Sequence, residues 1–460
     1  MIERRVIMSS TNIMTEGSIP KKIILFAVPV FLGQLFQQLY NMADSLIVGN
    51  FLGSSALAAV TSTGSLIFLL VGFFTGTAMG AGVIISRYFG AKDYDSVERA
   101  IHTAVAFGLV AGLIMTVCGM VFTPQILKLM STPKDVFVEA TGYLRVYFLG
   151  SLAVVLYNVG MSILQAMGDS KRPLYYLVIS SCVNIVLDMI FCGVFRLGVE
   201  FAALATVISQ MVSVILCFRR LICSDEVYRV VIKNIRFDPV MIRQVLTIGL
   251  PSGLQNSVIS IANVVVQSNI NSFGKMAMAG SGSYAKIEGF AFLPITCFSM
   301  AITTFIGQNL GAKEYDRVKK GAFFGVSCSI IAAEVIGVIT YLFIPQLIAL
   351  FDSTSEVIIY GTIHARTTSL FYFLLALSHA SAAVLRGAGK STVPMFIMLG
   401  SWCVFRITYI TVIRHFVEGI QIVFTAYPIT WTISSIAFLL CLWKMDWIHN
   451  FEKKENKECA

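Results

Sequence analysis

The sequence predicts an all-α integral membrane protein with twelve transmembrane helices, arranged as two six-helix bundles. Three observations predict this class. Of the 460 residues, 57% are hydrophobic and only 13% are charged, whereas soluble proteins carry about 25% charged residues. The apolar residues gather in runs long enough to cross a bilayer. The second part of the chain also repeats the first.

The repeat is clearest in the segment GAKDYD, which starts at Gly90 and returns as GAKEYD at Gly311. The same offset of 221 residues relates Pro173 to Pro394. An offset that is constant through loops and apolar runs alike indicates duplication of a whole unit. Duplicated apolar halves are typical of secondary transporters, whose substrate site lies where the halves face each other.

Twelve apolar segments qualify as spans, since a helix needs about 20 residues to cross the hydrocarbon. They lie near residues 23–48, 56–86, 101–122, 137–160, 173–193, 201–218, 244–270, 280–305, 321–344, 357–384, 393–413 and 420–443. The predicted organisation is an N-terminal segment (1–22), an N-lobe (23–218), a charged linker (219–243), a C-lobe (244–443) and a C-terminal tail (444–460).

The distribution of basic residues predicts the orientation. The loops on the side of both termini hold 25 Lys and Arg residues, and the opposite loops hold five. This bias predicts that both termini are cytoplasmic. Because each half has an even number of spans, both halves insert the same way up, which predicts a pseudo-two-fold axis along the membrane normal. The net charge of +9 thus reflects orientation, and we expect no nucleic-acid partner.

Polar residues within the spans of the first half predict a site. Asp44 in span 1 and Asp188 in span 5 each lie five residues before a glycine at the outer end of the span, and Thr206 lies five residues after the outer start of span 6. At 1.5 Å per residue, each lies about 8 Å below the outer boundary. Asn184 is one turn from Asp188 and on the same face of the helix.

Two carboxylates, an amide and a hydroxyl at one depth suit two kinds of coupling ion. Oxygen ligands of this kind can hold a hard cation such as Na⁺. Two neighbouring carboxylates in a low dielectric also titrate as a pair, which suits a proton. The alternative is that Asn184 and Asp188 only tie helices together while Asp44 lies in a wet vestibule. Equal depth on three spans favours the coupling site, and no other metal site is expected.

The second half keeps the frame of the repeat but not the acidic cluster. At the repeat offset, Asn184, Asp188 and Thr206 correspond to Phe405, Tyr409 and Tyr427. The acidic cluster therefore belongs to one lobe, and that lobe is predicted to carry the coupling.

The spans of the second half hold other charged residues. Glu288 in span 8 either attracts cationic substrates in a central cavity or pairs with Arg406 or Arg366 as a structural bridge. Glu334 in span 9 has no evident partner in the sequence. Pro29 lies early in span 1, where its missing hydrogen bond permits bending; the alternative is a static kink.

No sequence pattern predicts an enzyme. The motifs HExxH, GxSxG and GxxxxGK[ST] are absent, and the five histidines lack ligand spacing. We therefore expect neither catalysis nor a cofactor, apart from the coupling ion.

Several segments resemble the multidrug and toxic compound extrusion (MATE) family over about residues 18–445. They are PVFLGQLFQQLYNMADSLIVG in span 1, the two GAK(D/E)YD loops, the LQAMGDSKRP and LRGAGKSTVP turns, and NIVLD followed by GVEFAALATVISQ. The chain looks closest to the prokaryotic MepA-like and DinF-like branch. The resemblance implies a drug or cation antiporter that alternates between outward-open and inward-open states.

The resemblance also implies roles for individual residues. Asp44 matches the essential span 1 aspartate, and Asn184, Asp188 and Thr206 match the residues that join it in a H⁺ or Na⁺ site. Pro29 matches the proline at which span 1 bends. Four further residues match polar positions that line the substrate cavity: Gln37, Tyr40, Asn158 and Ser181.

Together these observations predict a multi-pass protein of the cell membrane that exports amphipathic, often cationic compounds such as drugs and dyes. We expect it to work as a monomer whose partners are these small organic substrates and membrane lipids. The alternative is an exporter or flippase of a lipid-linked precursor or metabolite. For a pyrophosphate-linked lipid, more cationic residues would be expected within the cavity.

Overall fold

The computed structural model describes residues 13–129, 132, 134–416 and 419–449, and these residues form helices and connecting loops without a strand. The outer parts of the predicted terminal segments, residues 1–12 and 450–460, lie outside the described residues. Eleven helices are long and apolar enough to cross a membrane, or twelve if one bent pair is a single span. The predicted fold class is confirmed.

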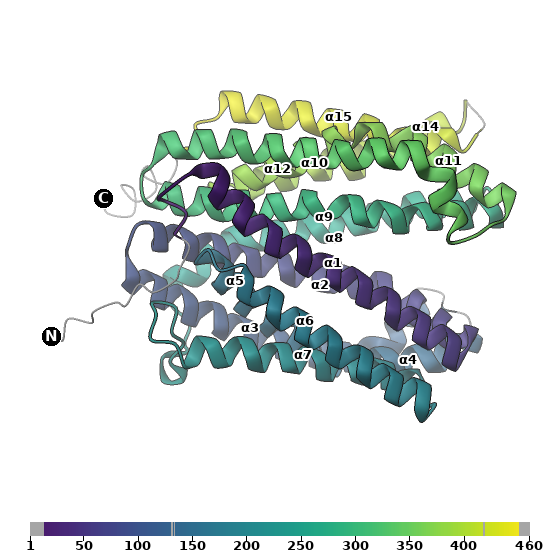
Figure 1. The fold of residues 1–460 in the computed structure, drawn as a ribbon, viewed down its shortest axis with the longest axis horizontal. Coiled ribbons are helices and arrows are strands. Elements are labelled where there is room, and N and C mark those ends of the chain that lie inside the picture. The colour runs from purple at the N-terminus through teal and green to yellow at the C-terminus, as the bar shows by residue number, and fades with distance from the viewer. Residues whose placement is uncertain (1–12, 130–131, 133, 417–418, 450–460) are drawn as a thin grey trace. The chain divides into compact units, whose positions relative to one another are not determined.

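The helices follow the chain in two sets (Figure 1). The first set is α1 (Ile19–Leu52), α2 (Ser54–Gly90), α3 (Tyr94–Leu129), α4 (Lys134–Leu149), α5 (Ser151–Ala166), α6 (Lys171–Asp188), the π-helix η1 (Met189–Val194) and α7 (Val199–Ile222). The linker contains a short 3₁₀ turn, η2 (Ile232–Asn234).

The second set is α8 (Pro239–Asn271), α9 (Lys275–Gly311), α10 (Tyr315–Ala349), α11 (Ser355–Thr368), the 3₁₀ turn η3 (Ser369–Phe371), α12 (Tyr372–Gly387), α13 (Thr392–Met398), the π-helix η4 (Leu399–Phe405), α14 (Arg406–Ile413) and α15 (Gln421–Lys444).

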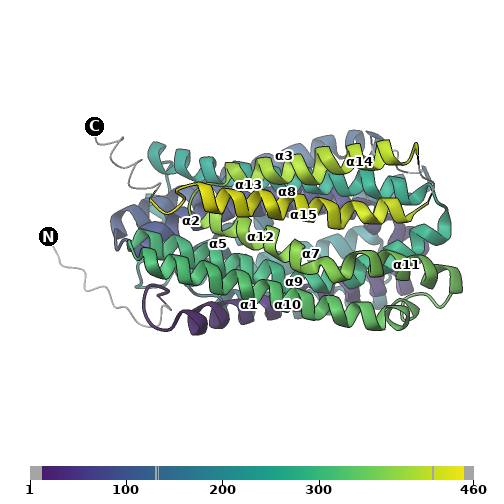
Figure 2. The ribbon, with the colours of Figure 1, turned by 90° about the horizontal axis from the view of Figure 1, so that it is seen from above.

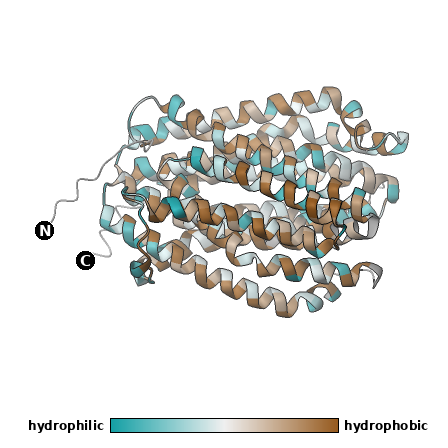
Figure 3. Cartoon of the chain, turned by 60° about the horizontal axis from the view of Figure 1, so that its bottom comes forward, coloured by the Kyte–Doolittle hydropathy of each residue, from teal (hydrophilic) through white to brown (hydrophobic). Residues whose placement is uncertain are grey.

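Each predicted span coincides with a helix or with a chain of short helices. The fourth is the bent pair α4 and α5, whose axes meet at 46° around Gly150. The tenth is α11, η3 and α12, and the eleventh is α13, η4 and α14. Colouring by hydropathy shows apolar residues along the middle of the helices and polar residues gathered at their ends and loops (Figure 3).

The chain forms two compact units whose boundaries cut through two helices. Within the described residues, unit 1 comprises residue 13 and those between 32 and 253, and unit 2 comprises residues 14–31 and those between 254 and 449. The first part of α1, up to Phe31, therefore packs within unit 2, and the first part of α8, up to Gly253, packs within unit 1. In unit 2, α9 packs along α10, α11 and α12, and α12 packs against α15 (Figure 2).

Glycines allow the first part of α8 to pack closely on α2 within unit 1. Gly76 and Gly80 form a GxxxG pattern on α2, and Gly249 and Gly253 form another on α8. A Cβ atom added at Gly80 would lie 2.4 Å from the Cα atom of Gly249. Only a hydrogen atom fits there, which is how small residues let membrane helices approach each other.

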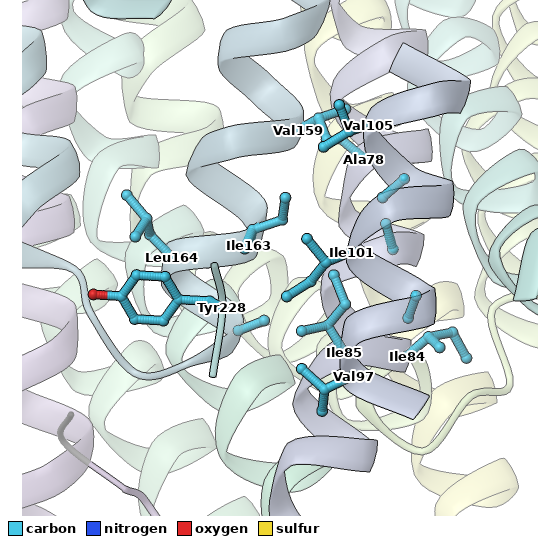
Figure 4. Packing of buried hydrophobic residues seen from close by; sticks show 14 of the residues in the cluster. Ala78, Ile84, Ile85, Val97, Ile101, Val105, Val159, Ile163, Leu164 and Tyr228 are labelled. Carbon is cyan, nitrogen blue, oxygen red and sulfur yellow. The ribbon is translucent and has the colours of Figure 1, made fainter. Parts of the chain in front are cut away.

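An apolar core joins α2, α3 and α5 in unit 1 (Figure 4). Ile84 and Ile85 come from α2, Ile101 from α3 and Ile163 from α5, and each is at most 2% exposed. The linker residue Tyr228 closes the same core.

Hydrogen bonds hold the linker on unit 1. The Tyr228 hydroxyl accepts hydrogen bonds from Arg172 Nη1 at 3.0 Å and Arg220 Nη2 at 2.9 Å. Farther along, the Val231 amide donates to His102 Nε2 at 2.9 Å. The start of α8 is thereby positioned for its contact with α2.

The segment before α1 is held in a comparable way by unit 2. The amide of Met14 donates to Gln308 Oε1 at 2.8 Å, and Arg317 donates to the carbonyl oxygens of Met14 and Gly17 at 3.1 and 2.8 Å. Met14 is only 1% exposed and joins an apolar core with Ile23 and Phe305. The segments that precede α1 and α8, the first helices of the two halves, are thus both held by hydrogen bonds.

Candidate functional site

Helix α1 carries three of the predicted residues on one face. Gln37, Tyr40 and Asp44 are spaced three and four residues apart, which places them in a row along the helix. The side chains of Gln37 and Tyr40 interact with each other, and Tyr40 lies within electrostatic range of Asp44. All three belong to unit 1. Pro29 lies inside the same continuous helix but in the part that packs within unit 2.

Helix α6 carries a second set of predicted residues along one face. Ser181, Asn184 and Asp188 follow one another at helical spacing and are 5%, 1% and 0% exposed. Asp188 is the last α-helical residue, and the wider turns of η1 begin directly after it. Such π-helical segments interrupt regular packing and occur frequently at functional sites.

The structure brings the predicted coupling residues together. The carboxyl groups of Asp44 and Asp188 lie within interaction distance of each other. The Asn184 amide approaches Thr206 Oγ1 of α7 at 3.5 Å, the upper limit of a hydrogen bond. The Thr206 hydroxyl donates to the Ala202 carbonyl at 3.2 Å. Four residues from three helices therefore share one region of unit 1, in which Asn184 and Asp188 are buried and Asp44 and Thr206 are half-buried.

The unusual property of this region is a surplus of acceptors. When both carboxyl groups are ionised, Asp44 Oδ1, both carboxyl oxygens of Asp188 and Asn184 Oδ1 are buried and accept no hydrogen bond from the described residues. A buried oxygen without a donor costs about 1–3 kcal/mol, and more when it carries charge. A proton shared by the carboxyl groups or a cation bound among the oxygens would relieve this cost.

The described part of the region does not form a cluster of metal-binding side chains. Among the residues that the structure describes, no three His, Cys, Asp or Glu side chains form a group that could hold a metal ion. The donor set is two carboxylates with neutral oxygens, which fits a weakly held hard cation better than a transition metal.

Two tyrosines of α4 and a cysteine of η1 belong to the same region but were not predicted. Tyr143 lies within electrostatic range of Asp44, Asp188 and Tyr147, and Cys192 lies within range of both carboxyl groups. The i, i+4 spacing of Tyr143 and Tyr147 was the available signal. This spacing did not identify the two tyrosines as site residues, because apolar spans commonly contain tyrosine.

The side chain of Asn158 forms no hydrogen bond with the carboxyl groups of Asp44 or Asp188. Its Oδ1 accepts a hydrogen bond from the Thr75 hydroxyl at 3.1 Å, and its Nδ2 donates to the Val154 carbonyl at 2.8 Å. Ser181, by contrast, lies in the same row of α6 as Asn184, and its hydroxyl has no partner among the described residues. Ser181 thus lies on the same helix as Asn184 and Asp188, whereas the hydrogen bonds of Asn158 are to other residues.

In unit 2, Glu288 lies among tyrosines and near Arg406. It is within electrostatic range of Tyr284, Tyr372 and Arg406. Its carboxylate forms no ion pair within 4.0 Å among the described residues. Arg406 instead donates to Thr430 Oγ1 at 2.8 Å and to Asn263 Oδ1 at 3.4 Å. The expected alternative of a direct bridge is therefore not formed in this conformation.

Glu334 of α10 forms a hydrogen bond with the backbone of α12. Its Oε2 accepts a hydrogen bond from the Phe373 amide at 3.0 Å, at the start of α12, where the break at η3 leaves backbone N–H groups without helical partners. The carboxylate thus caps the broken tenth span, a role that depends on a contact between α10 and α12.

Comparisons with known proteins agree with the duplicated plan. A family model described as MatE matches residues 29–190 and 251–412, two stretches that together exceed half of the chain. Each stretch begins at a proline inside the first helix of its half, Pro29 in α1 and Pro251 in α8.

Three bacterial relatives are similar along most of their lengths. The probable multidrug resistance protein YoeA of Bacillus subtilis is 27% identical over 91% of this chain and 92% of its own. The probable multidrug resistance protein NorM of Thermotoga maritima is 26% identical over 84% of each chain. The multidrug export protein MepA of Staphylococcus aureus is 26% identical over 80% of this chain and 79% of its own.

Solved structures share the fold at low sequence identity. One is described as the outward-facing conformation of a multidrug resistance MATE family transporter of the MOP superfamily; it has a TM-score of 0.89 and 23% identity, and covers 95% of this chain and 98% of that chain. A MATE structure in a bent conformation has a TM-score of 0.88 and 24% identity, and covers 96% of this chain and 98% of its own.

Proposed function

The chain belongs to the MATE family of multidrug transporters, and from this premise we propose that it is a secondary active exporter. It exchanges amphipathic, often cationic organic compounds for H⁺ or Na⁺ by alternating access. Members of this family are transporters rather than enzymes. The names of the relatives YoeA, NorM and MepA support small organic substrates.

The single observation that carries the coupling is the group of buried acceptor oxygens in unit 1. Asp44, Asp188 and Asn184 present carboxyl and amide oxygens with no donor among the described residues, and Thr206 adds a hydroxyl at 3.5 Å from the Asn184 amide. Such a set favours a bound proton or cation. The two carboxylates take the charge, and the neutral groups complete the coordination.

Coupling requires that the ion and the exported compound favour different states of the protein, by a few kcal/mol of differential binding. Competition for the same carboxylates supplies that difference. A cationic compound binds near Asp44 when the ion is absent, with Gln37, Tyr40, Asn158 and Ser181 lining its path in unit 1. In unit 2, Glu288 is proposed to attract such cationic compounds. Binding of the ion then neutralises the carboxylates and releases the compound. Bending of α1 at Pro29 is the proposed movement.

We further propose that both termini are cytoplasmic and that the protein works as a monomer. The 25 to 5 distribution of Lys and Arg supports cytoplasmic termini in the cell membrane. A single chain contains both halves, which supports a monomer as the working form.

The first prediction concerns Asp44. In proteoliposomes, ethidium efflux should follow an imposed pH or Na⁺ gradient, and Asp44→Asn should reduce the gradient-driven rate by at least about tenfold, since the substitution removes one of two charged ligands. The ion whose gradient drives efflux is the coupling ion. Asp95→Asn, a change to an exposed carboxylate at the start of α3, should leave the rate unchanged.

Two outcomes would contradict the proposal. An efflux rate that is the same with and without a pH or Na⁺ gradient would exclude antiport. Gradient-driven movement of a lipid-linked precursor, without movement of any dye, would favour the lipid exporter instead.

A further inference from the structure

Arg406 lies in a closely packed polar site of unit 2. Its side chain is only 1% exposed. The guanidinium lies over the rings of Trp402 and Tyr427, with its central carbon 5.1 and 4.6 Å from their centroids. Thr430 Oγ1 accepts hydrogen bonds from Nε at 3.3 Å and from Nη2 at 2.8 Å. These contacts determine the plane and direction of the guanidinium.

The charge of Arg406 is not matched by an adjacent carboxylate. No ion pair within 4.0 Å includes it among the described residues, and Glu288 acts on it only through space. Burying an ion with only neutral neighbours is unfavourable. An anionic ligand would therefore find a site that is already oriented and lacks a counter-ion.

The Nη1 atom is the part of the guanidinium that is least firmly held. Its one hydrogen bond among the described residues, to Asn263 Oδ1, is 3.4 Å long, which is weak by ordinary geometry. A carboxylate could replace the Asn263 oxygen here, and rotation of the Asn263 amide would present its NH₂ group to the same ligand. Arginine and amide donors together suit the two oxygens of a carboxylate.

Asn263 gives this site a polar approach. It is exposed and belongs to a row on α8 with Asn256, Ser260 and Gln267, spaced three and four residues apart. Polar residues within a span usually face a water-filled path or the interior of a bundle. The row therefore supports access from water to the Nη1 side of Arg406.

The helix containing Arg406 is built like the helix of the ion site in unit 1. Arg406 directly follows the π-helix η4, as Asp188 directly precedes η1. The widened turns lie in corresponding spans, the fifth and the eleventh, and each adjoins a buried charged residue. The signs of the two charges are opposite.

We propose that Arg406 and Asn263 form a carboxylate-binding site in unit 2, which favours exported compounds that bear a carboxylate. The inference rests on the proposed export function and specifies its substrate class. Glu288, which interacts electrostatically with Arg406, takes the cationic group of a zwitterion. Unit 1 binds the coupling ion, and unit 2 recognises the acidic group of the cargo.

The test compares matched ligands on the purified full-length protein. Fluorescence titration measures the affinities for ciprofloxacin, for its decarboxylated analogue and for ethidium, which has no carboxylate. Wild type should bind ciprofloxacin about tenfold or more tightly than the analogue, as expected for a charge-assisted hydrogen bond. Arg406→Gln should bring this ratio close to one and leave ethidium affinity within about twofold.

Three further variants separate charge from geometry. Arg406→Lys keeps the charge but not the planar fork, so it should keep only part of the ratio. Arg366→Gln is the matched control, because Arg366 is an exposed arginine of unit 2 that also lies over an aromatic ring, that of Tyr341; it should keep the full ratio. Asn263→Leu should reduce the ratio about threefold, and it tests the site even if Arg406→Gln does not fold.

The outcomes distinguish this site from the export function. A wild-type ratio near one, with normal ethidium binding and gradient-driven efflux, would overturn the carboxylate site and leave the antiporter intact. Equal weakening of all three ligands by Arg406→Gln would show that Arg406 only supports the fold. Absence of binding and efflux for every compound would instead count against the export function.

Discussion

At the scale of single residues, the proposed ion site depends on oxygens that have no donor. Buried acceptors are usually satisfied by hydrogen bonds, yet Asp188 is fully buried with both carboxyl oxygens unpartnered among the described residues. Burying these oxygens without donors lowers the stability of the folded state. In the proposed exchange cycle this property favours ion binding, because carboxylate oxygens that already accept hydrogen bonds gain less from a bound ion.

Thr206 offers a direct test of the neutral ligands. Thr206→Val keeps the shape of the side chain and removes one oxygen from the site. We expect the ion concentration for half-maximal efflux to rise about threefold to tenfold, equivalent to one net hydrogen bond of about 0.5–1.5 kcal/mol. Efflux is measured against a series of pH values or Na⁺ concentrations.

The matched control for Thr206→Val is Thr247→Val. Thr247 is an exposed threonine of unit 1 whose hydroxyl bonds to the carbonyl oxygen four residues earlier, as that of Thr206 does. An equal effect in both variants would mean that the hydroxyl acts on the helix and not on the ion.

At the scale of elements, the contact of α2 with α8 depends on glycine. Gly80→Ala places a Cβ atom 2.4 Å from the Cα atom of Gly249, so the helices must separate. We expect a loss of stability of about 1–3 kcal/mol, the usual cost of overpacking. Thermal unfolding of the purified protein in detergent, followed by intrinsic fluorescence, measures it.

Gly64 on the same helix serves as the control. A Cβ atom at Gly64 meets nothing within 4 Å, and alanine is favoured over glycine in a helix by about 1 kcal/mol. Gly64→Ala should therefore leave the unfolding temperature unchanged or raise it. Equal destabilisation by both substitutions would show that the contact at Gly249 is not the cause.

At the scale of the whole molecule, the two halves of the sequence are not the two units of the structure. The first parts of α1 and α8 each pack within the unit formed mainly by the other half. A fragment that ends at Ile222 lacks the α8 segment that packs on Gly76 and Gly80, and it also lacks the linker that closes the core at Tyr228.

The fragments 1–222 and 223–460 should therefore depend on each other. Expressed together, they should purify as a pair that retains ethidium efflux; expressed alone, each should accumulate at a small fraction of that level. Quantitative blotting of membrane fractions measures the difference. A fragment 1–222 that accumulates fully and unfolds cooperatively by itself would contradict this expectation.

The fold class, the apolar spans and the rows of polar residues along single helices follow from the sequence alone. Hydrophobicity and helical spacing are local properties, so the spans and the row of Asn184 and Asp188 could be predicted directly. The duplication was equally visible, because the offset between Gly90 and Gly311 is a property of the chain alone.

Only the tertiary structure decided which side chains from different helices meet. The proximity of Tyr143 to the carboxyl groups, the cap that Glu334 provides for α12 and the contacts of Arg406 all depend on the rotation of each helix about its axis. That rotation is set by packing of side chains over long separations in sequence, and it leaves no periodic pattern within one helix. For the same reason, the exchange of helix segments between the units could not be predicted from the repeat.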